Sequence, residues 1–137
     1  MNHELYENIR EQFHKEEAKL LLINPYMEPN DYWYKINKES NIHSTGFCYL
    51  ASEVYYHQTG KAKRWWFKEI KSDKLPYNGH HYYLQDKETG EIVDLTADQF
   101  GDIVIPYEES KNRGIRFESK AYKEFIKLLN GRRTKLN

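Results

Sequence analysis

Two β-prone segments joined by a short turn constrain this chain more than any other feature. Residues 80–86 and 91–96 are rich in histidine, tyrosine, isoleucine and valine, and the turn 87–90 between them ends in glycine. Two such segments separated by a few turn residues predict a β-hairpin. Pairing around this turn places opposite each other the residues whose numbers sum to 177.

That register decides which side chains share a face of the hairpin, because side chains alternate along a strand. One face is expected to carry His81, Tyr83, Asp94 and Thr96. His81 and Asp94 then lie on a diagonal within reach of a hydrogen bond. His80 points the other way, and a single β-bulge would exchange it for His81.

Helical periodicity precedes the hairpin. Apolar residues recur at helical spacing over residues 3–23, with Pro25 as the expected end of that helix. Residues 25–44 read as a long, partly irregular connection with one short helix. A second helix is expected over 46–59, with Ser44 or Thr45 as its N-cap and Gly60 as its terminator.

Further elements surround these. Residues 62–70 and 103–105 read as strands, and the Thr-x-x-Gln pattern at 96–99 predicts a short helix that Gln99 caps. The last helix is expected over 119–130, capped by Ser119, with Gly131 beyond its end. The expected class is α+β, with helices around a small antiparallel sheet.

The composition limits the function classes. The 137 residues predict a single domain, and 21 basic against 21 acidic residues give no net charge to attract nucleic acid. Only residues 131–135 are locally basic, and they read as a frayed tail. The start lacks a secretory signal, and no apolar run approaches the roughly 20 residues of a membrane span. We therefore expect a cytoplasmic protein that does not act in a membrane.

The chain has one cysteine, which excludes an internal disulfide and a cysteine-based zinc site. Cys48 lies near the expected start of the second helix, where backbone N–H groups and the helix dipole favour the reactive thiolate. The same N–H groups could stabilise an oxyanion, and Gly46 leaves room for a substrate backbone. The alternative is that Cys48 is a small apolar side chain in the core.

The hairpin supplies partners for this thiol. We predict His81 as the general base and Asp94 as the acid that orients it. Candidates for oxyanion or substrate contacts are Asn41, His43, Ser44, Gly46 and His80. Neighbouring residues of a strand face opposite ways, so a zinc site from His80, His81 and Asp94 is disfavoured, and no cofactor is expected.

These residues also resemble a known family pattern. The segments Gly46-Phe47-Cys48-Tyr49-Leu50-Ala51, His81-Tyr82-Tyr83 and Asp94-Leu95-Thr96-Ala97-Asp98-Gln99-Phe100 are similar to the papain-like core of transglutaminase-type and NlpC/P60-type proteins. The nearest pattern is that of small YunG-type proteins of bacteria and phages. The resemblance covers about residues 44–106.

The resemblance implies Cys48 as nucleophile, His81 as base and Asp94 as third member, in a single papain-like domain with added N- and C-terminal helices. It implies a bacterial or phage protein that acts in the cytoplasm. One departure is that papain-like peptidases place a glutamine shortly before the cysteine, whereas this chain has no glutamine between residues 13 and 57. Asn41, His43 or Ser44 would have to take that role.

The leading hypothesis is a cysteine-dependent acyl hydrolase or transferase, such as a peptidase, deamidase or transglutaminase-like enzyme, that acts on a protein or peptide. The alternative is a non-catalytic protein that binds a host factor through its aromatic surface. The chain has 12 Tyr, 6 Phe and 3 Trp residues, which suit either a partner surface or a small mixed core. Around residues 26–34 and 65–67 these side chains cluster.

Overall fold

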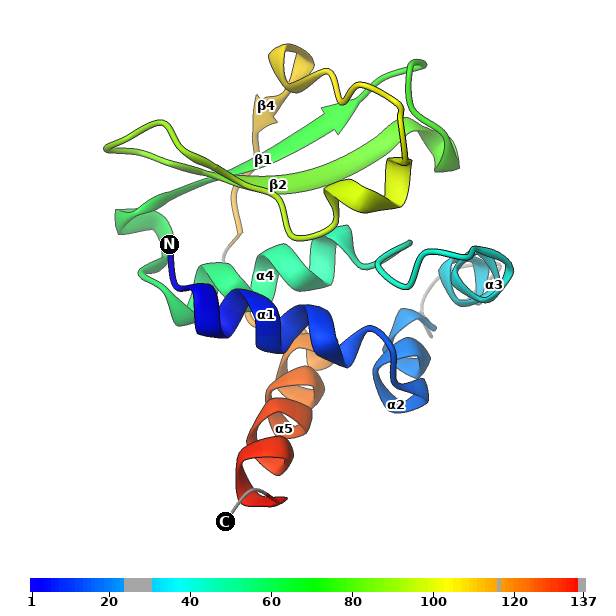
Figure 1. Ribbon diagram of the computed structural model, residues 1–137. Coiled ribbons are helices and arrows are strands. Elements are labelled where there is room, and N and C mark those ends of the chain that lie inside the picture. The colour runs from blue at the N-terminus through cyan, green and yellow to red at the C-terminus, as the bar shows by residue number, and fades with distance from the viewer. Residues whose placement is uncertain (24–30, 116, 136–137) are drawn as a thin grey trace.

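In the computed structural model, which describes residues 1–23, 31–115 and 117–135, a small antiparallel sheet lies above a layer of helices (Figure 1). The helices are α1 (His3–Gln12), α2 (Glu16–Lys19), α3 (Tyr32–Glu39), α4 (Cys48–Gln58) and α5 (Lys120–Lys135). The strands are β1 (Trp65–Lys71), β2 (His80–Asp86), β3 (Ile92–Val93) and β4 (Lys111–Asn112). The 3₁₀ helices are η1 (Leu20–Leu22), η2 (Lys61–Lys63), η3 (Tyr77–Gly79), η4 (Ala97–Phe100) and η5 (Tyr107–Glu109). The expected α+β class is confirmed.

The sheet has the order β3-β2-β1-β4, and β2 pairs with β1 along its whole length. β3 is much shorter and pairs with β2 only at Leu84↔Val93 and Gln85↔Ile92. Both pairs sum to 177, so the predicted hairpin register is confirmed. Because the chain leaves the sheet after Val93, no strand among the described residues pairs with the first half of β2 on that side.

α4 is the central helix of the fold. It crosses beneath the sheet, and α1 and α5 lie on its other side (Figure 1). The apolar stripe predicted for it, namely Phe47, Leu50, Ala51 and Val54, is buried. Glu53 of α4 is also buried, and it accepts hydrogen bonds from the backbone N–H and the hydroxyl of Ser119 at 2.9 and 2.7 Å. This contact fixes the start of α5 against α4.

The predicted N-cap of this helix is wrong. α4 begins at Cys48 with Phe47 in the cap position, and no side chain caps it. The hydroxyl of Ser44 instead donates to Asp98, and that of Thr45 contacts Ser40. At the other end, Gly60 follows the helix with a φ of +117°, as expected of a terminator.

The single helix expected over residues 3–23 is wrong as well. α1 ends at Gln12, Lys15 is extended, and α2 and η1 then continue in a new direction. The break lets Phe13 stack on Phe47 at 4.5 Å while Ala18 and Leu22 reach the core. Burial of both segments outweighs the continuity of the helix. The expected end at Pro25 lies outside the described residues.

Three other expectations need correction. Residues 103–105 form no strand, Val104 is 85% exposed, and β4 occupies the edge of the sheet beside β1. The strand expected from residue 62 begins at Trp65, after η2. α5 continues through Gly131 to Lys135, so this basic end is helical rather than frayed.

The six largest fully buried side chains of the described residues are all aromatic, namely Trp65, Tyr55, Tyr83, Phe13, Phe47 and Phe125. Trp66 and Phe117, by contrast, are 42% and 82% exposed. The aromatic content of the chain therefore serves mainly the core. None of the described helices has the length and apolarity needed to cross a bilayer.

Candidate active site

The candidate site forms where β3 leaves the sheet. There the start of α4 lies beside the uncovered part of β2, because the Ser52 hydroxyl donates to the Tyr82 carbonyl oxygen at 3.4 Å. The loop before α4 is joined to η4, since the Gly46 N–H donates to Gln99 Oε1 at 3.3 Å. The chain after β3 turns away from β2 at this point, and the start of α4 thus brings Cys48 close to His81 and Asp94.

His81 and Asp94 form the shortest contact of this group. His81 Nε2 lies 2.7 Å from Asp94 Oδ2, and both side chains are almost fully buried. The edge-to-face packing of Phe100 on His81, with ring centroids 4.8 Å apart, restricts the imidazole further. The predicted choice of His81 over His80 agrees with this geometry, because His80 lies on the other face of β2 opposite Lys71.

Cys48 also acts on the imidazole. The thiol is close enough to His81 to raise its pKa, yet the buried Nδ1 forms no hydrogen bond of standard geometry with any described residue. A nucleophile and its base are often poorly aligned before substrate binds. Since Nε2 faces Asp94, Nδ1 is the nitrogen left for the thiol.

The charge of His81 follows from these neighbours. Burial lowers the pKa of His81, but the hydrogen bond to Asp94 and the interaction with Cys48 together raise it more, to about 9. At neutral pH the ring is therefore an imidazolium beside the Asp94 carboxylate.

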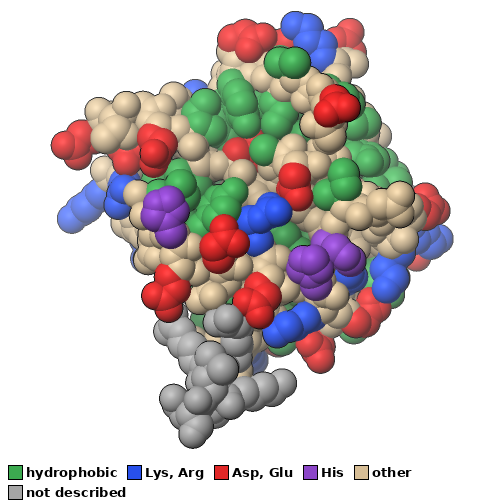
Figure 2. Space-filling model, in the orientation of Figure 1, with side chains coloured by type: hydrophobic (Ala, Val, Ile, Leu, Met, Phe, Trp, Pro, Cys, Tyr) green, Lys and Arg blue, Asp and Glu red, His purple; other side chains and the backbone are tan. Residues whose placement is uncertain are grey.

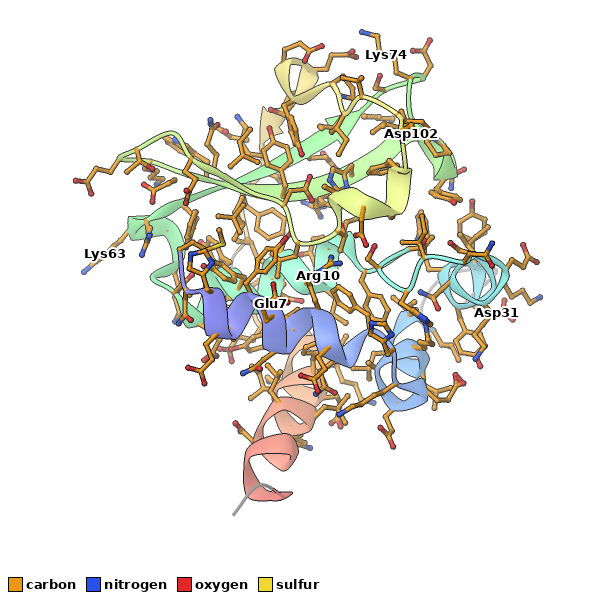
Figure 3. All side chains as sticks on the ribbon, viewed as in Figure 1. Glu7, Arg10, Asp31, Lys63, Lys74 and Asp102 are labelled. Carbon is orange, nitrogen blue, oxygen red and sulfur yellow. The ribbon has the colours of Figure 1, made fainter. Side chains whose placement is uncertain are left out.

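A second network, which the sequence did not predict, holds the loop before Cys48. Asp98 accepts the Ser44 hydroxyl at 2.7 Å and both terminal nitrogens of Arg10 at 3.0 and 3.1 Å. Arg10 also donates to the Leu95 carbonyl oxygen at 2.6 Å, and its side chain extends from α1 towards η4 (Figure 3). α1, the Cys48 loop and η4 are thereby joined on one side of the site.

Gln99 acts in the same place. It does not cap η4 through the backbone as predicted; its amide donates to the Thr96 hydroxyl at 2.8 Å, and its oxygen accepts from Gly46. The Thr-x-x-Gln pattern was therefore the available signal, but it predicted a local contact rather than one across the site. The Tyr107 hydroxyl, which donates to Asp94 Oδ2 at 2.8 Å, had no signal in the sequence.

Three of the remaining candidates, His43, Ser44 and Gly46, have other partners. His43 Nδ1 lies 3.1 Å from the buried ammonium of Lys19, and Asn41 is exposed. The Ser44 hydroxyl and the Gly46 N–H are occupied by Asp98 and Gln99. An oxyanion can therefore be met by the uncapped first N–H groups of α4, which include that of Cys48 and have no acceptor within the helix.

The site is closed in this conformation, because Cys48 is only 8% exposed. A hollow of about 280 Å³ lies beside the preceding loop and is lined by Arg10, Phe13, His14, Asn41, Ile42, His43, Ser44 and Asp98. A second hollow, of about 420 Å³, is lined by residues 71–73 and 75–79. Neither is lined by Cys48. In the view of Figure 2, hydrophobic side chains gather over the sheet and charges of both signs spread below it.

Within the described residues, no group of three or more histidine, cysteine or acidic side chains is placed to hold a metal ion. No protein-family model, curated protein or solved structure matches the chain.

Proposed function

We propose that this protein is a cysteine-dependent acyl hydrolase or transferase, with Cys48 as nucleophile, His81 as general acid and base, and Asp94 as the group that orients His81. The observation that carries the proposal is the buried His81 ring, whose Nε2 lies 2.7 Å from Asp94 Oδ2 and whose pKa is raised by both Asp94 and the Cys48 thiol. This is the order of groups that activates a thiol nucleophile.

The reaction follows from that order. The Cys48 thiolate attacks the carbonyl carbon of an amide, ester or thioester, and the carbonyl electrons move onto oxygen. The uncapped N–H groups at the start of α4 stabilise this oxyanion. The His81 imidazolium then gives its proton to the leaving group as the bond to carbon breaks, which leaves an acyl-thioester on Cys48.

The second half regenerates the enzyme. Neutral His81 takes a proton from water or from an amine, which attacks the thioester, and the sulfur leaves as a thiolate. Asp94 keeps Nε2 of His81 engaged throughout, so that Nδ1 serves the thiol. Hydrolysis, deamidation and transamidation share these steps and differ in the attacking group.

The resemblance to papain-like proteins supports the same roles, since that core carries Cys, His and Asp in this order. It favours a protein or peptide substrate and a bacterial or phage origin. A reducing compartment such as the cytoplasm suits a site that depends on one free thiol.

The closed site favours a second candidate function. With Cys48 8% and His81 0% exposed, the three residues could serve as a buried polar cluster in a protein that only binds a partner. In that case Cys48→Ala would leave partner binding unchanged, whereas substitution of exposed aromatic residues such as Trp66 would abolish it.

Acyl-enzyme trapping separates the two. Incubation with p-nitrophenyl acetate, followed by intact-mass and peptide analysis, should find one acetyl group on Cys48. Acetylation should be lost in Cys48→Ala and strongly slowed in His81→Ala. The matched control is His80→Ala, which removes the neighbouring histidine of β2 and should acetylate like the wild type. Absence of acetylation in the wild type would favour the binding function.

A further inference from the structure

Asp94 has a second donor on the oxygen that contacts His81. The Tyr107 hydroxyl donates to Asp94 Oδ2 at 2.8 Å, and His81 Nε2 lies 2.7 Å from the same atom. We infer that Tyr107 is a positioning residue of the site, which limits how strongly Asp94 holds the proton of His81. The catalytic role of Tyr107 rests on the proposed function, whereas its effect on His81 can be tested without it.

Tyr107 is held firmly in place. It begins η5, its N–H donates to the Ile105 carbonyl oxygen at 2.9 Å, and its ring packs edge-on against Tyr83 at 4.8 Å. The Tyr83 hydroxyl in turn donates to Ser110 at 2.8 Å and contacts the Tyr107 carbonyl oxygen at 3.4 Å. The hydroxyl of Tyr107 is therefore directed at Asp94 by its backbone and by its ring.

The carboxylate is fixed by these contacts. Oδ2 meets Tyr107 and His81, while Oδ1 accepts the Thr96 N–H at 3.3 Å, so rotation of the carboxylate would break bonds on both oxygens. A carboxylate held at both oxygens presents one defined lone pair to Nε2. This arrangement keeps the imidazole oriented towards Cys48.

Tyr107 also tunes the charge of Asp94. Burial, the charge of Asp94 and the hydrogen bond to it all raise the pKa of Tyr107, so the hydroxyl keeps its proton and always donates. A neutral donor takes up part of the carboxylate charge and so weakens its attraction for the imidazolium proton. His81 thus releases its proton to a leaving group more readily than it would beside Asp94 alone.

Other titratable groups lie near the Asp94 carboxylate. Burial and the charge of Asp94 raise the pKa of Tyr6 in α1 and of Tyr83 in β2. The charge of Glu108 also raises the pKa of Tyr83. The Cys48 thiol raises the pKa of His81. In the described residues, only Tyr107 among the tyrosines donates to the oxygen that His81 uses.

The test is a titration of His81 by NMR of histidine-labelled protein, with its signal assigned by comparison with His81→Ala. In Tyr107→Phe the donor is lost and the ring is kept, so the pKa of His81 should rise by about half a unit to one unit. The matched control is Tyr83→Phe, which removes a hydroxyl of the same cluster that does not touch Asp94. It should shift the titration of His81 much less than Tyr107→Phe does.

Two results would overturn the role of Tyr107: an unchanged titration in Tyr107→Phe, or an equal rise in both variants, which would indicate general loosening of the cluster. The titration needs no substrate, so it is independent of catalysis. If Cys48 is not acetylated by p-nitrophenyl acetate but His81 still shifts in Tyr107→Phe, the proposed function fails and the role of Tyr107 as a positioning residue stands.

Discussion

His81 is the residue on which the candidate site depends, because it contacts both other members. Its ring has no solvent exposure, so each ring nitrogen needs a hydrogen-bond partner within the protein. Nε2 has Asp94 at 2.7 Å, and Nδ1 is left for Cys48. An imidazolium in such a place is stable only while the carboxylate beside it is charged.

Replacement of Asp94 by asparagine tests this dependence. Without the carboxylate, the pKa of His81 should fall from about 9 by about 1–3 units. The change can be followed in the NMR titration of His81. A titration in Asp94→Asn that matches the wild type would show that Asp94 does not hold the imidazolium.

The same variant changes how stability depends on pH. A raised histidine pKa stabilises the folded protein fully below the unfolded value of 6.5, and this stabilisation is lost as pH rises through the folded value of about 9. As the pH rises from 6.5 to about 9, the free energy of unfolding should therefore fall more steeply in the wild type than in Asp94→Asn. Urea unfolding at several pH values measures both slopes, and equal slopes would contradict the account.

Contacts between individual side chains could be predicted from the sequence where a local pattern fixes which residues are neighbours in space. The hairpin turn and the alternation of side chains were enough to place His81, rather than His80, beside Asp94. Tyr107 and Asp98 could not be found in this way. Their contacts with Asp94 and Ser44 depend on how η5 and η4 fold back over the site, which no local pattern encodes.

Among the elements, the turn before β2 positions His81 most directly. Gly79 has a φ of +74°, and a Cβ atom there would lie 2.3 Å from the Ser72 carbonyl oxygen. The backbones of these two residues are also joined, because the Ser72 N–H donates to the Gly79 carbonyl oxygen at 2.9 Å. A side chain at Gly79 must therefore displace backbone two residues before the base.

Gly79→Ala should consequently lower the free energy of unfolding by at least about 3 kcal/mol, from left-handed strain and the backbone clash together. The matched control is Gly90→Ala in the hairpin turn, where φ is +77° but nothing lies within 4 Å of the added Cβ. That change should cost only about 1–2 kcal/mol. Urea unfolding measures both, and equal losses would mean that the contact with Ser72 does not constrain the turn.

Elements were predicted well where burial and local pattern agree, as in α4 and the β2–β3 hairpin. They were missed where packing overrode the pattern. The helical spacing across Phe13 continues, yet the chain breaks there so that Phe13 can stack on Phe47. Residues 103–105 are β-branched, but the place beside β1 is taken by Lys111 and Asn112. Strand propensity without a free partner strand gives a loop.

At the scale of the whole molecule, α4 connects the candidate site to the core. Its first turn carries Cys48, its middle is buried beneath the sheet, and Glu53 anchors α5. The site is thus built on the most buried helix, which gives rigid geometry but leaves the thiol only 8% exposed. A bulky substrate must therefore move side chains over Cys48 before it can react.

The most direct test of the central claim is the rate at which iodoacetamide, a small reagent, alkylates Cys48 near neutral pH. The chain has one cysteine, so the intact mass reports this residue alone. If His81 activates Cys48, alkylation should be about tenfold faster than that of free cysteine. The advantage should vanish in His81→Ala and persist in His80→Ala. A rate no faster than that of free cysteine, unchanged in His81→Ala, would contradict the proposed site.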